Sequence, residues 1–121
     1  MIISKLHLPL NDNNGAALTE VHAKLKRAIV KIFNGCTVTT GQGVWMDKGK
    51  IYDEPVAIYE IAHWGAEYKI KQFMELVHEY GARANQLAVY CVIDKHATII
   101  DIVKPFNSRP SPSRPNTNKQ Y

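Results

Sequence analysis

Two segments of the chain carry apolar residues at helical spacing, and each lies between stretches whose pattern is typical of β-strands. In residues 16–34 the apolar positions recur every three or four residues, and they are Leu18, Val21, Leu25, Ala28, Ile29 and Ile32. In residues 67–80 they are Ile70, Phe73, Met74 and Val77. We expect two amphipathic helices that end at Gly35 and Gly81, because glycine readily adopts the left-handed conformation found at helix C-termini.

Five strand patterns surround these helices. Residues 2–10 alternate between apolar and polar side chains, as expected of a half-buried strand. Residues 36–40 and 44–46 predict a strand interrupted at Gly41–Gly43, and a turn at 47–50 joins it to an apolar run at 56–62. Pro55 has no N–H to donate, so we expect it at the beginning of that run. Residues 86–93 and 98–103 predict a second hairpin with its turn at 94–97.

The resulting order is β-α-β-β-α-β with one extra strand at the C-terminal end. This order predicts an α+β, ferredoxin-like fold, in which two helices cover one face of an antiparallel sheet. A chain of 121 residues is long enough for one such domain. We place the domain at residues 1–104 and expect a basic tail, rich in Pro, Ser and Asn, at 105–121.

The distribution of charge excludes some classes of function. The net charge is +4, and the four basic residues that follow position 103 account for all of it, so the rest of the chain is neutral. A neutral body argues against a nucleic-acid-binding platform. No apolar run approaches the length of a membrane span, and no basic leader precedes the first strand, so we expect a cytoplasmic protein. If a phage encodes it, the compartment is the cytoplasm of a bacterial host.

The chain has no motif that predicts a metal or another cofactor. Cys36 and Cys91 lie far apart in strand-like stretches, and the five histidines never fall at metal-ligand spacing. We expect both cysteines to be small, free residues of the core in a reducing compartment.

The most unusual stretch of the sequence is residues 41–54. Its glycines allow a ligand to approach the backbone closely, and Trp45 offers a flat face for a base or a sugar. Glu54 follows as a possible acceptor or general base. The alternative is a plain hairpin, in which the glycines allow bends and the acidic residues keep the tip soluble.

The same stretch carries a resemblance to a known family. The series Gly35, Thr37, Val38, Gly43, Trp45, Gly49 and Glu54, followed by an apolar strand, resembles the central pattern of an uncharacterised bacterial and phage family of ferredoxin-like domains. Tyr80 and the run Gln86-Leu-Ala-Val89 fit the same pattern. The resemblance covers most of residues 35–93 and implies the same fold.

A second similarity is to the phage S-adenosylmethionine lyases. Glu54-Pro-Val-Ala-Ile and Gln86-Leu-Ala-Val-Tyr match two strand openings of that family in order and spacing. This similarity implies a site between the subunits of a trimer, where Glu54 stabilises the sulfonium and Gln86 orients the amino-acid end of the substrate. The tyrosine expected on the preceding turn corresponds to Tyr52 or Trp45, and Pro55 departs from the family's pattern.

Basic residues suggest a different ligand. Several lie on the first helix and others follow the second helix or lie in the tail, and they are Lys24, Lys26, Arg27, Lys31, Arg83, Arg109 and Arg114. Arginine can bind phosphate through two parallel hydrogen bonds, so these residues suggest an anionic ligand. The alternative is that they form a solvated helix face and a solubilising tail.

Three functional hypotheses follow. The first is a small-molecule-binding protein, of the kind phages use for counter-defence, that sequesters an anionic nucleotide-like ligand between subunits. In it Arg27, Arg83 and Arg109 neutralise phosphate, and Trp45 or Tyr90 stacks on the base. The second is an S-adenosylmethionine lyase that uses Glu54 and Gln86. The third is a nucleic-acid or protein interaction module that acts through the tail. Because one face of the sheet is left bare, we also expect a homo-oligomer, either a trimer or a multiple of dimers.

Overall fold

The computed structural model describes residues 1–102 of the chain. The predicted tail, with Arg109, lies outside the described residues. In chain order the elements are β1 (Ile2–Pro9), α1 (Thr19–Phe33), β2 (Thr37–Asp47), β3 (Lys50–His63), α2 (Glu67–Arg83), β4 (Ala88–Ile93) and β5 (His96–Asp101). This order is the one predicted from the sequence.

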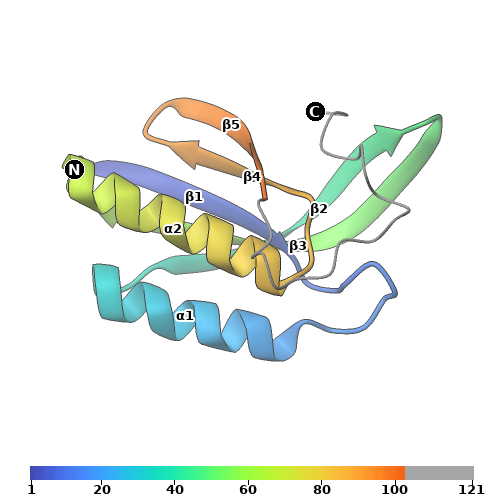
Figure 1. Ribbon diagram of the computed structural model, residues 1–121, viewed down its shortest axis with the longest axis horizontal. Helices are drawn as coiled ribbons and strands as arrows, with labels where there is room; N and C mark the ends of the chain where they lie inside the picture. Colours follow the sequence, from blue (N-terminus) through green and yellow to red (C-terminus); the bar gives the residue numbers. More distant parts are fainter. Residues whose placement is uncertain (103–121) are drawn as a thin grey trace.

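The strands form one five-stranded sheet in the order β2-β3-β1-β4-β5, and every neighbouring pair is antiparallel. Both helices lie side by side on one face of this sheet (Figure 1). The ferredoxin-like fold with an extra strand is therefore confirmed. Since β3 and β4 both run antiparallel to β1, they are parallel to each other, and their N-terminal ends lie at the same end of the sheet.

The core fills the space between the sheet and the helices. Fully buried side chains come from alternate positions of the central strands and from one stripe of each helix, and they include Leu6, Leu8, Tyr59, Ile61, Cys91, Leu25, Ile29, Phe73 and Val77. His22 on α1 is also buried, with both ring nitrogens bonded to core groups, Nδ1 to the Tyr59 hydroxyl and Nε2 to the Pro9 carbonyl. The helices cover only this face, so within residues 1–102 the opposite face of the sheet has no second layer.

The β2–β3 hairpin extends well beyond the rest of the sheet (Figure 1). Pairing between β1 and β3 stops at Pro9 and Val56, whereas pairing between β2 and β3 continues to Asp47 and Lys50. Residues 42–55 therefore form a two-stranded projection, which we call the arm. Lys48 and Gly49 form its tip with φ values of 53° and 80°, as a two-residue type I′ turn requires.

Two expectations for this hairpin are wrong. The interruption expected at Gly41–Gly43 is absent, because β2 pairs with β3 in one unbroken register. Pro55 lies inside β3 rather than at its beginning. Its carbonyl accepts a hydrogen bond from the Leu10 N–H, on the edge of β3 that pairs with β1 from Val56 onward. The missing N–H of Pro55 faces that same side, where the Leu10 carbonyl accepts a hydrogen bond from the Leu18 N–H instead, so that carbonyl is not left without a donor.

Neither helix ends at the predicted glycine, and each is followed within two residues by an asparagine in the left-handed conformation. Asn34, with φ of 72°, follows α1, and Asn85, with φ of 59°, follows α2. Helix α1 also begins at Thr19, later than expected, because residues 11 and 17 pair in an isolated bridge. Gly81 lies within α2, where an added Cβ would come within 2.6 Å of Ile102 and 2.9 Å of Val89. Glycine is present there because the chain after β5 packs directly on the helix.

We predict that Gly81→Ala lowers the free energy of unfolding by about 1–3 kcal/mol, because the new methyl group overpacks the contact with Ile102 and Val89. This effect opposes the higher helix propensity of alanine, which alone is worth about 1 kcal/mol. Urea denaturation followed by circular dichroism measures the change. Gly35→Ala is the matched control, since nothing lies within 4 Å of its added Cβ, and its stability should stay within about 0.5 kcal/mol of the parent. Equal stability of the two variants would contradict the packing explanation.

Candidate functional site

Two aromatic rings stack on the arm. Trp45 of β2 and Tyr52 of β3 are register partners, and their ring centroids lie 4.5 Å apart with the planes inclined by 15°. The Lys50 ammonium lies 5.1 Å from the centroid of the Tyr52 ring. The pair therefore already contacts one cation, which is favourable because the face of an aromatic ring is electronegative. Trp45 remains 41% exposed, so part of the indole is available to a ligand.

Glu54 lies on the same face of the arm as this pair, because it is two residues beyond Tyr52 on β3. Burial raises the pKa of Glu54 above its ordinary value, and a hydrogen bond from the Trp45 side chain partly offsets the rise. The indole N–H is the only donor that the tryptophan side chain offers, so it is the group that interacts with the carboxylate. An acid and an aromatic pair are thus held together in one small cluster, which we call the arm site and define as Trp45, Tyr52 and Glu54.

Glycine keeps the backbone next to the arm site bare. Gly43 is the register partner of Glu54, and Gly41 is the partner of Val56. A Cβ added at Gly43 would lie 3.4 Å from Val56 and 4.0 Å from the Glu54 side chain. Because Gly41 and Gly43 have no side chains, neither covers the residue paired with it on β3. The Glu54 carboxylate is therefore open to a ligand lying across β2.

The uncovered face of the sheet carries a second group of polar and aromatic residues. His7 and Tyr90 contact each other edge to face, with their ring centroids 4.8 Å apart. Lys5 forms a salt bridge of 3.7 Å with Glu60. Burial, and to a lesser degree the charge of Lys5, lowers the pKa of His7. Sequence reasoning named Tyr90 but missed His7, whose only signal is its place on the polar side of an alternating strand.

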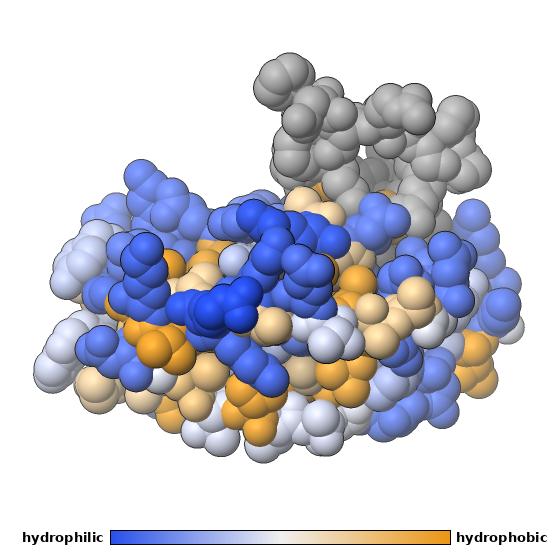
Figure 2. Space-filling view, turned by 90° about the horizontal axis from the view of Figure 1, so that it is seen from below, coloured by the Kyte–Doolittle hydropathy of each residue, from blue (hydrophilic) through white to orange (hydrophobic). Residues whose placement is uncertain are grey.

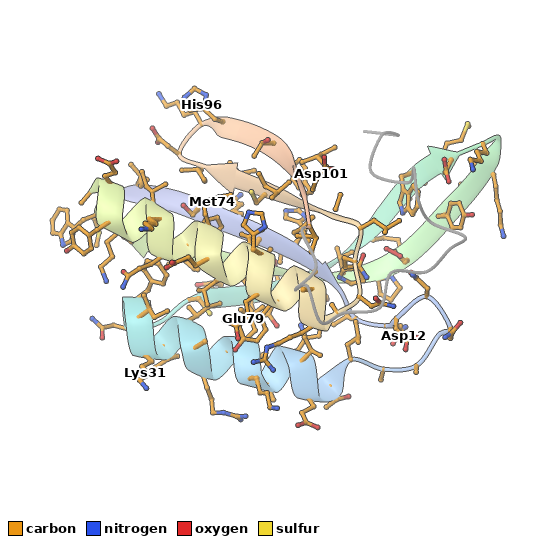
Figure 3. The ribbon with its side chains drawn as sticks, in the orientation of Figure 1. Asp12, Lys31, Met74, Glu79, His96 and Asp101 are labelled. Atoms are coloured by element: carbon orange, nitrogen blue, oxygen red, sulfur yellow. The ribbon has the colours of Figure 1, made fainter. Side chains whose placement is uncertain are left out.

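The remaining predicted site residues lie elsewhere. Arg27 is exposed on α1, and Arg83 at the end of α2 donates two hydrogen bonds to Glu79, of 3.0 and 2.8 Å (Glu79 is labelled in Figure 3). Both arginines belong to the helix layer, whereas Trp45 and Tyr90 face the other side of the sheet. Gln86 lies just before β4 and donates to the Ala84 carbonyl at 3.1 Å. It is at the same end of the sheet as Glu54, because β3 and β4 are parallel.

The arm site has the chemistry of a receptor for an organic cation. A carboxylate supplies the opposite charge, and two ring faces supply apolar contact and cation–π attraction. Among residues 1–102, no three His, Cys, Asp or Glu side chains lie close enough together to hold a metal ion. No helix of the described part is long and apolar enough to cross a membrane.

Comparisons with known proteins identify similar folds. No protein-family model and no curated protein matches the sequence. A phage S-adenosylmethionine lyase in complex with S-methyl-5'-thioadenosine is 15% identical, with 83% of this chain and 88% of that chain covered, at a TM-score of 0.64. A phage S-adenosylmethionine lyase in the apo state is 14% identical, with 88% and 92% covered, at 0.63. CutA1 from Pyrococcus horikoshii OT3 is 15% identical, with 88% of each chain covered, at 0.52. At these identities the likeness shows the fold alone.

Proposed function

We propose that this protein binds S-adenosylmethionine at the arm site and cleaves it to release methylthioadenosine. The observation that carries the proposal is the position of Glu54, whose carboxylate is held beside the stacked Trp45–Tyr52 pair. S-adenosylmethionine combines an aromatic base with a permanent sulfonium charge. A carboxylate next to two aromatic faces complements both features.

The chemistry needs little from the protein. The carboxylate of the substrate attacks its own γ-carbon, forming a C–O bond as the C–S bond breaks. The bonding electron pair goes to sulfur, which leaves as the neutral thioether of methylthioadenosine, and the amino-acid part closes to a lactone. No proton or water is consumed. Glu54 holds the sulfonium in place, and Gln86 contacts the amino-acid end so that the carboxylate is oriented for attack.

The similarity to solved structures supports this choice over other ligands for the same fold. One similar structure is described as a phage S-adenosylmethionine lyase with S-methyl-5'-thioadenosine bound, which is the product that our proposed reaction releases. The order and spacing of Glu54 and Gln86 along the chain agree with the same assignment.

The charges of the described residues favour a cationic ligand over the anionic nucleotide of the first hypothesis. The ionisable side chain bonded to Trp45 is an acid. Arg83 is already neutralised by Glu79, and Arg27 lies in the helix layer. An anionic ligand stacked on Trp45 would meet the Glu54 carboxylate, with Lys50 beside the Tyr52 ring but neither arginine to offset the repulsion.

We also propose that the working unit is a homo-oligomer in which a second copy covers the arm. An isolated two-stranded hairpin is marginally stable in water, because it buries little apolar surface. Val44, Met46 and Ile51 are each more than 60% exposed on this arm. Exposed apolar side chains gathered on one projection are typical of an interface. These three side chains lie on the face of the arm opposite to the arm site, because successive residues of a strand point to opposite faces.

Fluorescence of the two tryptophans, Trp45 and Trp64, tests ligand binding at the arm. In a Trp64→Phe variant the remaining emission comes from Trp45, and we expect S-adenosylmethionine to quench it with saturation. In the matched Trp45→Phe variant the emission comes from Trp64, which is on the loop after β3, and we expect no saturable change. S-adenosylhomocysteine lacks the sulfonium charge and should bind about tenfold more weakly, equivalent to about 1.4 kcal/mol. Equal affinity for the two compounds, or a response from Trp64 only, would contradict the proposal.

A further inference from the structure

We propose that a groove on the helix side of the molecule, between α1 and the loop that follows β1, binds a small phosphate-bearing molecule through Lys26 and Arg27. This site is separate from the arm site and does not depend on the function proposed for it. Figure 2 shows the α1 side of the molecule, where hydrophilic side chains gather over the helix and leave apolar patches between them.

The groove has the size of a small-molecule site. Its volume is about 590 Å³, and its walls come from Leu10, Asn11 and Ala17 of the loop and from Thr19, Lys26 and Arg27 of α1. Sites for small ligands range over about 300–1,000 Å³. The groove can therefore hold a phosphate group together with a compact organic body.

Backbone contacts fix the walls of the groove. Residues 11 and 17 pair across the base of the loop, and the Leu18 N–H donates to the Leu10 carbonyl at 2.9 Å. Within the loop, one carboxylate oxygen of Asp12 accepts from the N–H groups of Asn14 and Ala16 at 2.8 and 2.9 Å. Below it, the buried His22 ring donates to the Pro9 carbonyl at 2.7 Å. A site built on such fixed elements needs little ordering when a ligand binds.

The charge on the groove is positive and unbalanced. Lys26 and Arg27 line it, and no aspartate or glutamate of the described residues does. The salt bridges within residues 1–102 use other cations, Lys5, Lys24 and Arg83, so neither groove cation has an acidic partner there. An anion entering the groove would meet two cations without displacing an internal ion pair.

The donors of the groove suit phosphate in particular. The arginine guanidinium can present two parallel N–H groups to phosphate oxygens, and the lysine ammonium adds a point charge. The Thr19 hydroxyl and the Asn11 amide supply neutral donors. Among the described residues, no Phe, Tyr or Trp lines the groove, and the His22 ring that does is buried, so a base would find no exposed ring face on which to stack. These features favour a phosphate ester with a compact, non-aromatic body.

Amide chemical shifts of the full chain test this site, with glycerol 3-phosphate and inorganic phosphate as the probes. We expect saturable shifts at the Leu10, Ala17 and Ala23 amides, with glycerol 3-phosphate binding more tightly than phosphate. The double variant Lys26→Gln, Arg27→Gln should weaken binding at least tenfold. Lys24→Gln is the matched control, because Lys24 lies on the same helix, does not line the groove and pairs with Glu20 at 3.2 Å.

Three results would overturn the inference. Shifts scattered over all the basic residues, or equal weakening by Lys24→Gln, would show attraction to diffuse charge and no site. Tighter binding of AMP than of glycerol 3-phosphate at these amides would contradict the non-aromatic ligand class. Binding of glycerol 3-phosphate should be unchanged by Glu54→Gln, so failure of this inference is distinguishable from failure of the proposed lyase function.

Discussion

Replacing Glu54 with glutamine is expected to lower kcat/KM for methylthioadenosine release from S-adenosylmethionine by at least about tenfold, because the sulfonium is then bound without its opposite charge. Glutamine has nearly the same shape and can still accept the hydrogen bond from Trp45, so the arm should keep its structure. Only the negative charge beside the sulfonium is lost. Chromatographic detection of methylthioadenosine measures the rate.

Glu60→Gln is the matched control for this experiment. Glu60 lies on the same strand and the same face as Glu54, but it pairs with Lys5 at 3.7 Å and lies outside the arm. We expect its rate to stay within about threefold of the parent, since an exposed pair contributes less than about 1 kcal/mol. Equal losses in both variants would mean that general negative charge on the sheet, and not Glu54, is responsible.

The same carboxylate predicts a pH dependence of binding. Burial raises the pKa of Glu54, so the carboxyl takes up its proton at a higher pH than an ordinary glutamate. The ionised form attracts the sulfonium, and affinity for S-adenosylmethionine is therefore full above that pKa and lost as the pH falls through it. The Glu54→Gln variant should lack this step. Wild-type affinity that stays constant down to the range of an ordinary glutamate would contradict the role of Glu54.

Replacing Ile51 with aspartate is expected to convert the oligomer to a monomer. Ile51 is 63% exposed on the arm, and in the proposed assembly a second copy covers it. An unpaired carboxylate in that interface would lose its hydration without gaining a partner, which costs several kcal/mol. Light scattering of the full chain measures the mass, and circular dichroism checks that each variant is folded.

Val30→Asp is the control for the assembly. Val30 is 52% exposed on α1, so the substitution is of the same kind at a comparable exposure but lies away from the arm. We expect this variant to keep the oligomeric mass of the parent. A monomeric parent would contradict the proposed assembly, and an oligomer that survives Ile51→Asp and not Val30→Asp would place the interface elsewhere.

The periodicity of apolar residues was sufficient to predict the order of the elements. The stripe through Leu25 and Ile29 and the alternation around Leu6 and Leu8 reflect burial against the same core, so pattern and structure agree there. The turn at 47–50 was also visible, whereas the second turn is shorter than the predicted 94–97, because His96 already pairs with Ile93. Both turns contain a residue that tolerates a positive φ, Gly49 and Asp94.

The errors concern glycine and proline, whose roles depend on neighbours distant in sequence. Gly81 looks like a helix end until Ile102 and Val89 are known to pack against it. Pro55 looks like a strand start until β1 is known to end beside it. In both cases the deciding contact comes from another strand or from the chain after it, and local pattern carries no information about that contact.

The candidate site was predictable only in part, because its geometry also depends on contacts between residues distant in sequence. Glu54 and Trp45 were named from their residue types and spacing. The stacking of Trp45 on Tyr52 depends on the exact pairing of β2 with β3, which no local pattern specifies. Arg27 and Arg83 were grouped with Trp45 by charge alone, whereas the fold places the arginines in the helix layer. Their separation from Glu54 is what moves the proposal from an anionic ligand to a cationic one.

Incubation of the purified full chain with S-adenosylmethionine shows whether the protein is a lyase. Products are separated by chromatography and identified by mass. We expect methylthioadenosine and a homoserine-derived lactone in equal amounts, formed over many turnovers and not formed when the protein is omitted. S-adenosylmethionine that is recovered intact, whether free or bound to the protein, would contradict the claim that this protein is a lyase.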